Sequence, residues 1–418
     1  MRKRLWVAIP LTIASLVAIL ILFYFVPPIN QRLSWRVDFA LTYVRSLVNP
    51  AGEVPTPLPQ PAVAVTQHPT PIQQQLTAAT VAVTPTQGPT ATLEPSPTPI
   101  PESAQLPAPQ WEKQDINNCG PASLAMYLRF YGWEGDQFDI ANLLKPKRED
   151  RNVNVEELTY YARTRAGWLT TEFRVGGDIN ILKSLVAAGF PVMIEEGTHV
   201  QSNYWPDDDN WAGHYLLITG YDDNTQIFTA QDSFRKPDMT VSYDEVDKNW
   251  QAYNRVYILV FPPAQEDTIM DILGEHWDID ANRQHALEVA KAETVNDPEN
   301  AYTWFNLGSN LVYFERYQEA ARAYDQARTL GLPQRMLRYQ FGPFFAYFFG
   351  GRNDDLLALT DYALQRTPNA EEALLWHGWA MYREGKIGQA ISDFYQALEE
   401  NPNFEDARYA LDFVKENQ

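Results

Sequence analysis

The chain has 418 residues but only one cysteine, Cys119, and only six histidines. A single cysteine excludes an internal disulfide and any metal site built from several cysteines. The sequence also lacks the glycine-rich phosphate-binding loop of an ATPase. We therefore expect neither a cofactor nor a metal. A net charge of −20 argues against nucleic acid as a partner, because phosphates are bound by basic surfaces.

The first 30 residues are expected to anchor the chain in a membrane. Leu5–Val26 is an uncharged run of 22 residues, which is about the length that spans a bilayer core. We find no small-residue cleavage site after it, so an uncleaved anchor fits better than a signal peptide. The basic cluster at positions 2–4 favours a cytoplasmic N-terminus. This orientation predicts extracytoplasmic globular domains on a single-pass membrane protein.

Two segments connect the expected anchor to the globular part. Residues 31–50 are interpreted as a juxtamembrane helix, either amphipathic at the membrane surface or an ordinary helix. Residues 51–107 are rich in Pro and Thr and contain no Lys or Arg. Such a composition is too poor in apolar side chains to close a core, and its prolines favour an extended chain. We interpret this stretch as a disordered stalk, either glycosylated or a plain spacer.

Residues 265–418 contain internal repeats, marked by prolines at a spacing of 35, 35 and 34 residues: Pro298, Pro333, Pro368 and Pro402. Each proline follows an Ala-rich stretch with helical periodicity. In the clearest unit the pattern is carried by Trp304, Leu307, Gly308, Ala320, Tyr324 and Ala327. This pattern resembles the tetratricopeptide repeat, strongly in two units and weakly in two others, with a polar cap at the end. The resemblance implies an all-α solenoid that binds a partner protein or a substrate.

An aromatic cluster occupies the weak unit between residues 335 and 368: Phe341, Phe344, Phe345, Tyr347, Phe348 and Phe349. Aromatic stripes are usually part of a core. We therefore expect this cluster to pack against the neighbouring domain, with peptide docking as the alternative.

Residues 108–263 contain Cys119. Unlike the helical repeats, this range contains predicted strands separated by glycines. The stretch "CGPASLAMYLRFYG" after Asn118 predicts a helix that begins at Cys119 and ends near Gly132. Pro121 suits the first helical turn, where a missing N–H costs little. At a helix N-terminus, peptide dipoles and free N–H groups favour an anion, and hence a reactive thiolate. Cys119 is thus either a buried small residue or a nucleophile.

A thiolate nucleophile needs a base that a third group orients. The stretch "GHYLLITGYDDNTQIFTAQD" predicts a β-hairpin with His214 at the start of one strand and Asp232 at the end of the next. In an antiparallel pair these positions can be neighbours, so Asp232 could hold the imidazole beside the thiol. The other nearby histidine, His199, has no comparable carboxylate. Gln114, five residues before Cys119, could donate to an oxyanion together with the Cys119 N–H.

The order Gln, Cys, His, Asp resembles papain-like cysteine peptidases. The motifs "Q-x4-CGPASLAM", "AAGFPVMIEEG", "GHYLLITGYD" and "AQDS" are similar to the bacteriocin-processing, double-glycine-leader peptidases and their peptidase-like relatives. The resemblance implies an α+β papain-like domain over residues 108–263. In it Cys119 is the nucleophile, His214 the base and acid, Asp232 the orienting group and Gln114 the oxyanion-hole donor.

Three functions stay open at this point. The first is a membrane-anchored thiol peptidase that cleaves a peptide or protein. The second is a non-catalytic peptide-binding scaffold on the same fold, and the third is an acyltransferase that uses the same thioester. The acidic loop "WPDDDNWAGH" before His214 is expected to be solvated; a calcium site or attraction of a basic substrate are the alternatives.

Overall fold

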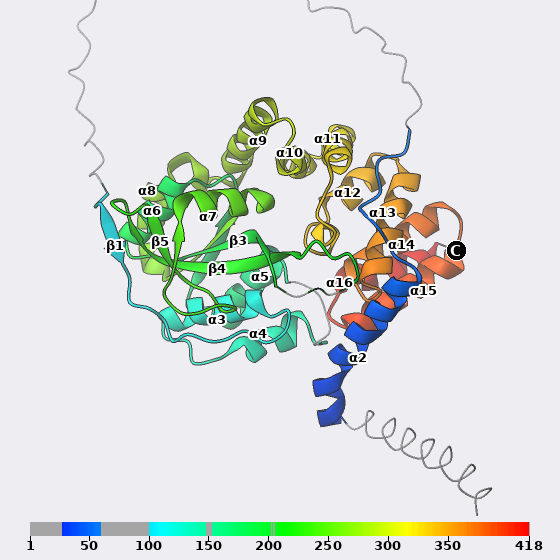
Figure 1. The fold of residues 1–418 in the computed structure, drawn as a ribbon, viewed down its shortest axis with the longest axis horizontal. Coiled ribbons are helices and arrows are strands. Elements are labelled where there is room, and N and C mark those ends of the chain that lie inside the picture. Colours follow the sequence, from blue (N-terminus) through cyan, green and yellow to red (C-terminus); the bar gives the residue numbers. More distant parts are fainter. Residues whose placement is uncertain (1–26, 60–99, 148–152, 202, 204, 418) are drawn as a thin grey trace, which may run out of the picture.

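The structure is a computed structural model that describes residues 27–59, 100–147, 153–201, 203 and 205–417. The expected anchor Leu5–Val26 lies outside these residues, and so does the middle of the expected stalk. Within the described ranges, no helix combines the length and the apolar character that crossing a bilayer needs. Figure 1 shows a sheet domain and a helical domain packed side by side.

The sheet domain is built on seven antiparallel strands in the order β2-β7-β3-β4-β5-β6, with β1 paired to β4. The strands are β1 (Ser103–Gln105), β2 (Thr170–Arg174), β3 (Val192–His199), β4 (Trp211–Asp222), β5 (Ile227–Gln231), β6 (Met239–Ser242) and β7 (Tyr257–Phe261). The longest strand, β4, lies between β3 and β5. Its Tyr215 and Leu217 belong to one core cluster and Leu216 and Ile218 to another, as strand alternation requires.

Helices cover both faces of this sheet (Figure 1). One face is covered by α3 (Cys119–Phe130), α4 (Gln137–Leu144) and α5 (Val155–Arg165), and the other by α6 (Ile179–Ala187), α7 (Tyr243–Trp250) and α8 (Glu266–Leu273). Helix α4 begins at a capping box in which Asp136 accepts from Phe138 and Asp139. Helix α3 ends at Phe130, Tyr131 is its C-cap residue, and Gly132 follows in the left-handed region with φ of 84°. The helix predicted after Asn118 is therefore confirmed.

The helical domain stacks antiparallel helix pairs. Its elements are α9 (Ile279–Asn296), α10 (Ala301–Tyr313), α11 (Tyr317–Leu330), α12 (Gly342–Phe349), α13 (Asn353–Arg366), α14 (Glu371–Arg383), α15 (Ile387–Glu400) and α16 (Glu405–Glu416). Small residues allow each pair to approach closely. A side chain at Gly308 would meet Tyr324 at 2.7 Å, and one at Gly378 would meet Phe394 at 2.5 Å. These are the positions that the repeat pattern reserves for glycine.

The aromatic cluster of the weak repeat is only partly buried, and it packs within the repeats. Phe344 and Tyr347 have no exposed surface, whereas Phe349 is 51% exposed. Two rings of the cluster contact Trp376 of the next repeat. The centroid of Phe345 lies 4.5 Å from that of Trp376, and the centroid of Phe348 lies 5.4 Å from it. The expectation that the cluster packs on the neighbouring domain is thus wrong for these rings.

Both described ends of the expected stalk, residues 51–107, contact the rest of the fold. At its far end β1 joins the sheet, where Ala104 lies opposite Tyr221 of β4. At its near end residues 51–59 follow helix α2 (Pro27–Val48) and contact the repeats, and Val54 is only 5% exposed. The local sequence indicates neither contact, because each needs a partner far away in the chain.

The acidic loop before His214 joins the two domains instead of being fully solvated. Asp208 is buried and forms an ion pair with Arg335, which also donates to the Trp211 carbonyl at 2.7 Å. Trp205 has no exposed surface and lies between the guanidinium groups of Arg335, at 4.6 Å, and Arg366, at 5.0 Å. No cluster of three or more metal-ligating side chains was found in the described part of the chain. The solvated-loop expectation is therefore wrong for Asp208.

Candidate active site

Cys119 is the first residue of α3 and is only 6% exposed. The helix rests directly on β4, because Gly120 leaves room for the Tyr215 ring, which a side chain there would meet at 3.3 Å. Ser123 Oγ strengthens this contact by donating to the Tyr215 carbonyl at 3.2 Å. The sulfur is thus held beside the strand residue that follows His214.

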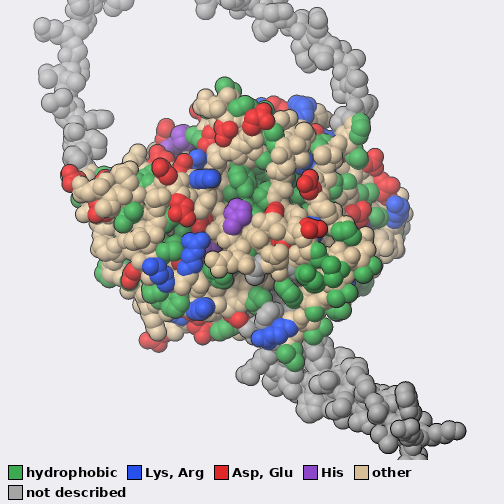
Figure 2. Space-filling view, viewed as in Figure 1, with side chains coloured by type: hydrophobic (Ala, Val, Ile, Leu, Met, Phe, Trp, Pro, Cys, Tyr) green, Lys and Arg blue, Asp and Glu red, His purple; other side chains and the backbone are tan. Residues whose placement is uncertain are grey.

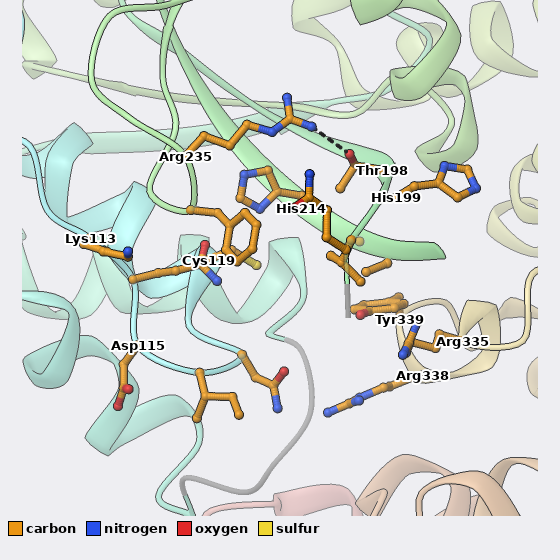
Figure 3. Close-up of a pocket in the computed structure, with 18 of the residues that line it drawn as sticks. Lys113, Asp115, Cys119, Thr198, His199, His214, Arg235, Arg335, Arg338 and Tyr339 are labelled. Atoms are coloured by element: carbon orange, nitrogen blue, oxygen red, sulfur yellow. Dashed lines mark hydrogen bonds between the residues drawn. The ribbon is translucent and has the colours of Figure 1, made fainter. Parts of the chain in front are cut away.

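His214 and Asp232 meet across the β4–β5 pair. The distance between His214 Nε2 and Asp232 Oδ1 is 2.9 Å, and both side chains are buried. Asp232 Oδ1 also accepts from the backbone N–H groups of Phe234, at 2.8 Å, and Arg235, at 3.0 Å. The carboxylate is therefore fixed by its own loop before it meets the imidazole. Because Nε2 of His214 contacts Asp232, Nδ1 is the ring nitrogen that is left for Cys119. Figure 3 shows the side chains of Cys119 and His214 in one pocket.

The charge of His214 follows from these contacts. Burial disfavours the imidazolium, but hydrogen bonds with Asp232 and Cys119 outweigh it and raise the pKa of His214 to about 10. For Asp232, burial alone would raise the pKa, yet the contact with His214 and the two backbone donors lower it. Both effects favour an imidazolium–carboxylate pair at neutral pH.

The loop before Cys119 is held by the side chain of Gln137 at the start of α4. Gln137 Oε1 accepts from the Asp115 N–H at 2.7 Å and from Asn118 Nδ2 at 2.8 Å. Its Nε2 donates to the Lys113 carbonyl at 2.9 Å. Gln114 is thereby placed at the pocket. Its Oε1 accepts from Ser233 Oγ at 2.9 Å, so its NH2 group is the part that can donate elsewhere.

A second carboxyl group lies beside His214 that motif analysis missed. Glu196 of β3 is directly opposite His214 in the strand register and is 3% exposed. Burial is the main reason why its pKa rises to about 7, although the nearby His214 charge acts in the opposite direction. Only the pairing of β3 with β4 reveals this neighbour, and the register could not be read from the sequence.

The pocket has a volume of about 710 Å3 and contains Cys119, His214 and Gln114. Asp232 lies behind His214. Three further lining residues come from the repeats: Arg335, Arg338 and Tyr339. Tyr339 contacts Trp211 edge-to-face at 5.7 Å between centroids, next to the His214 strand. Pattern analysis assigned these repeat residues no role here, because nothing local marks a contact between domains.

Basic side chains outnumber acidic ones around this pocket. Lys113, Arg235, Arg335 and Arg338 line it, against Asp115 among the acidic residues. Arg235 reaches across the mouth toward Thr198, with 3.5 Å between Nη2 and Oγ1 (Figure 3). Figure 2 shows blue basic side chains gathered on this face, over the sheet domain. Of these residues, Arg335 is paired with the buried Asp208, and both repeat arginines are almost fully buried.

A family model, described as the Peptidase_C39 like family, matches residues 100–258. These residues, a little over a third of the chain, are thus similar to that family. The matched range contains the four residues that motif analysis singled out as a site, and it begins before β1. The helix pairs that follow form a tetratricopeptide-repeat region, so the chain is a fusion of the two.

Individual relatives are similar to parts of the chain. The cytochrome c-type biogenesis protein CycH of Pseudomonas aeruginosa is 31% identical over 116 residues, which is 27% of this chain and 28% of that protein. The chain thus spans little more than a quarter of this curated relative. The peptidase domain of Streptococcus ComA, a bifunctional ABC transporter involved in quorum sensing, is 14% identical, with coverage of 37% and 98% and a TM-score of 0.29. YrrB, a tetratricopeptide-repeat protein with an unusual peptide-binding site, is 20% identical, with coverage of 37% and 83% and a TM-score of 0.29.

The pairing of His214 with Asp232 predicts the behaviour of one titration. In Asp232→Asn the negative charge that stabilises the imidazolium is lost while the burial that opposes it remains, so the pKa of His214 should fall from about 10 by more than one unit. In the native chain the pair stabilises the fold fully below pH 6.5, and this contribution is lost as the pH rises through about 10. Imidazole NMR of the chain at increasing pH measures the shift.

His377 of the repeats is the internal control for this experiment. Its pKa is raised to about 9, against the effect of burial, by hydrogen bonds with Asp361 and Asp393, far from the pocket. Its titration should be the same in the native chain and in Asp232→Asn. An unchanged His214 titration in the variant would contradict the pairing.

Proposed function

We propose that the sheet domain is a cysteine peptidase that cleaves a peptide bond through Cys119, His214 and Asp232. The observation that carries the proposal is the contact of His214 with Asp232 on one side and with Cys119 on the other. A buried, oriented imidazole beside a thiol at a helix N-terminus is the arrangement that nucleophilic catalysis by cysteine requires. The family of residues 100–258 supports the same chemistry.

The proposed reaction has two steps. Cys119 Sγ attacks the carbonyl carbon of the scissile bond, and the imidazolium of His214 gives its proton to the departing amine as the C–N bond breaks. Water then attacks the carbonyl carbon of the thioester and His214 takes a proton from the water. The C–S bond breaks, which releases the acid and restores the Cys119 thiolate beside the His214 imidazolium. Asp232 holds the ring at Nε2 throughout.

The negative oxygen formed in each step needs hydrogen-bond donors. Cys119 opens α3, so its backbone N–H has no acceptor within the helix and can point at this oxygen. Gln114 offers a second donor, because it lines the pocket and Ser233 occupies its Oε1, which leaves its NH2 group to donate. We propose these two groups as the oxyanion hole.

This proposal predicts the ranking of three variants. Cys119→Ala should abolish cleavage of a peptide library, because the nucleophile is gone, while leaving the thermal unfolding midpoint close to that of the native chain. Gln114→Ala should lower kcat by about 10²–10³-fold, the usual loss for one oxyanion donor. Gln284→Ala, the same substitution at an exposed position of α9 outside the pocket, is the matched control and should keep kcat within about threefold. Cleavage by Cys119→Ala would exclude the proposed nucleophile.

We further propose that the chain is held at a membrane by Leu5–Val26, with both domains on the extracytoplasmic side and the repeats recruiting a protein partner. Support comes from the helix that follows this run. Helix α2 exposes apolar side chains at helical spacing, namely Leu33, Val37, Leu41, Val44 and Val48. An apolar stripe beside the end of an apolar run suits a membrane surface.

The anchor can be tested by extraction. The full chain should stay with the membrane pellet in alkaline carbonate and be released by detergent, because an apolar span is not removed by breaking electrostatic contacts. A chain that starts at residue 27 is the control and should be released by carbonate. Release of the full chain by carbonate would overturn the proposed anchor.

A further inference from the structure

Residues 49–58, directly after α2, lie along helix α13 of the repeats without forming a helix or strand of their own (Figure 1). At the C-terminal end of α13, Gln365 Nε2 donates to the Asn49 carbonyl at 3.1 Å. Tyr362 Oη donates to the Gly52 carbonyl at 3.3 Å, and Arg366 donates to the same oxygen. One helix end thus binds two main-chain carbonyls of this segment.

The same segment is bound at the other end of α13 by a different pair of side chains. Arg328 of α11 donates to the Pro55 carbonyl at 2.8 Å and to the Thr56 carbonyl at 3.0 Å. Asp355, in the first turn of α13, accepts from the Leu58 N–H at 3.1 Å. The segment therefore runs along the whole length of α13, in the opposite direction.

The groups that bind the segment are also held by other side chains of the repeats. The Arg328 side chain has no exposed surface, and it is held by Asp355, at 2.9 Å, and by Tyr347 Oη, at 2.9 Å. A charged donor that is already oriented loses little entropy on binding. This makes the end of α11 a built site rather than a surface contact.

The composition of residues 49–58 suits a site that binds main-chain carbonyls. Its prolines, at positions 50, 55 and 57, favour an extended backbone with carbonyls pointing outward and need no partner for a missing N–H. The buried apolar anchor is Val54, which is 5% exposed and belongs to the main core cluster, and the partly buried Ala51 packs against the same cluster. Recognition is thus mostly of the main chain, with one buried side chain.

We infer that α11 and α13 form a binding site for an extended, proline-containing peptide, and that its ligand is residues 49–58 of the same chain. No part of this inference rests on the proposed peptidase activity. A segment tied to the chain has an effective concentration in the millimolar range, so an external peptide of the same sequence competes poorly. A partner of this face of the repeats must displace the segment.

The site also determines where α2 lies. The segment continues directly from α2, and Phe39 of α2 lines the pocket that contains Cys119. Binding of residues 49–58 to the repeats therefore holds α2 next to that pocket.

The test uses the full chain in detergent and the variant Val54→Asp, which places a charge where the buried anchor lies. In the native chain, hydrogen exchange measured by mass spectrometry should be slow at the Leu58 amide, whose N–H donates to Asp355, and in Val54→Asp at least tenfold faster. A labelled peptide with the sequence of residues 49–59 should bind Val54→Asp at least tenfold more tightly than the native chain, since its site is vacated.

Two further variants keep the result interpretable. Glu53→Gln changes an exposed neighbour and should match the native chain in both measurements. Val54→Ser should also speed up the hydrogen exchange and tighten binding of the labelled peptide, by less than Val54→Asp does. Its melting temperature should be unchanged. Equally fast exchange at the Leu58 amide in the native chain and Val54→Asp, or a labelled peptide that fails to distinguish the two chains, would overturn the inference.

Discussion

The register between β4 and β5 is the constraint on which the candidate site depends. Leu217 pairs with Gln231 at the end of this ladder, so His214 and Asp232 lie just beyond it and can meet at 2.9 Å. Strand side chains alternate between faces, so a slip by one residue would turn His214 away from Asp232. The irregularity between Ile218 and Gly220 sets this register, because it shifts the pairing further along the strand.

A second constraint is the rigid contact between the two domains. Trp205 is enclosed by two arginines of the repeats, and Arg335 pairs with the buried Asp208. Asn254 and Asn310 add a reciprocal pair of amide hydrogen bonds, at 2.9 and 3.1 Å. The repeats are therefore part of the pocket wall, and not only a recruiting module attached to it.

Local patterns in the sequence were sufficient for the elements that carry the site. The helix after Asn118 and the hairpin that carries His214 and Asp232 both follow from periodicity and turn residues. The family match to residues 100–258 agrees with the motifs around Cys119 and His214. These features depend on neighbours in sequence, which is why they could be read without a structure.

The features that were missed all depend on partners far away in the chain. Glu196 faces His214 only through the pairing of β3 and β4. Asp208 looked like part of a solvated loop because its partner Arg335 is 127 residues away. Residues 49–58 looked like a stalk by composition, yet the repeats supply donors for their carbonyls. A segment that is buried by residues far away in the chain need not have the hydrophobic periodicity of a helix or strand, so its own sequence does not show that it is buried.

The central claim is that His214 activates Cys119, and the chain is well suited to test it because it has one cysteine. The measurement is the rate of Cys119 alkylation by iodoacetamide between pH 5 and pH 9, in the native chain and in His214→Ala. We predict that the native rate near pH 6 exceeds that of the variant by at least tenfold, because the imidazolium stabilises the thiolate. Equal rates and equal pH profiles in the two chains would contradict the account.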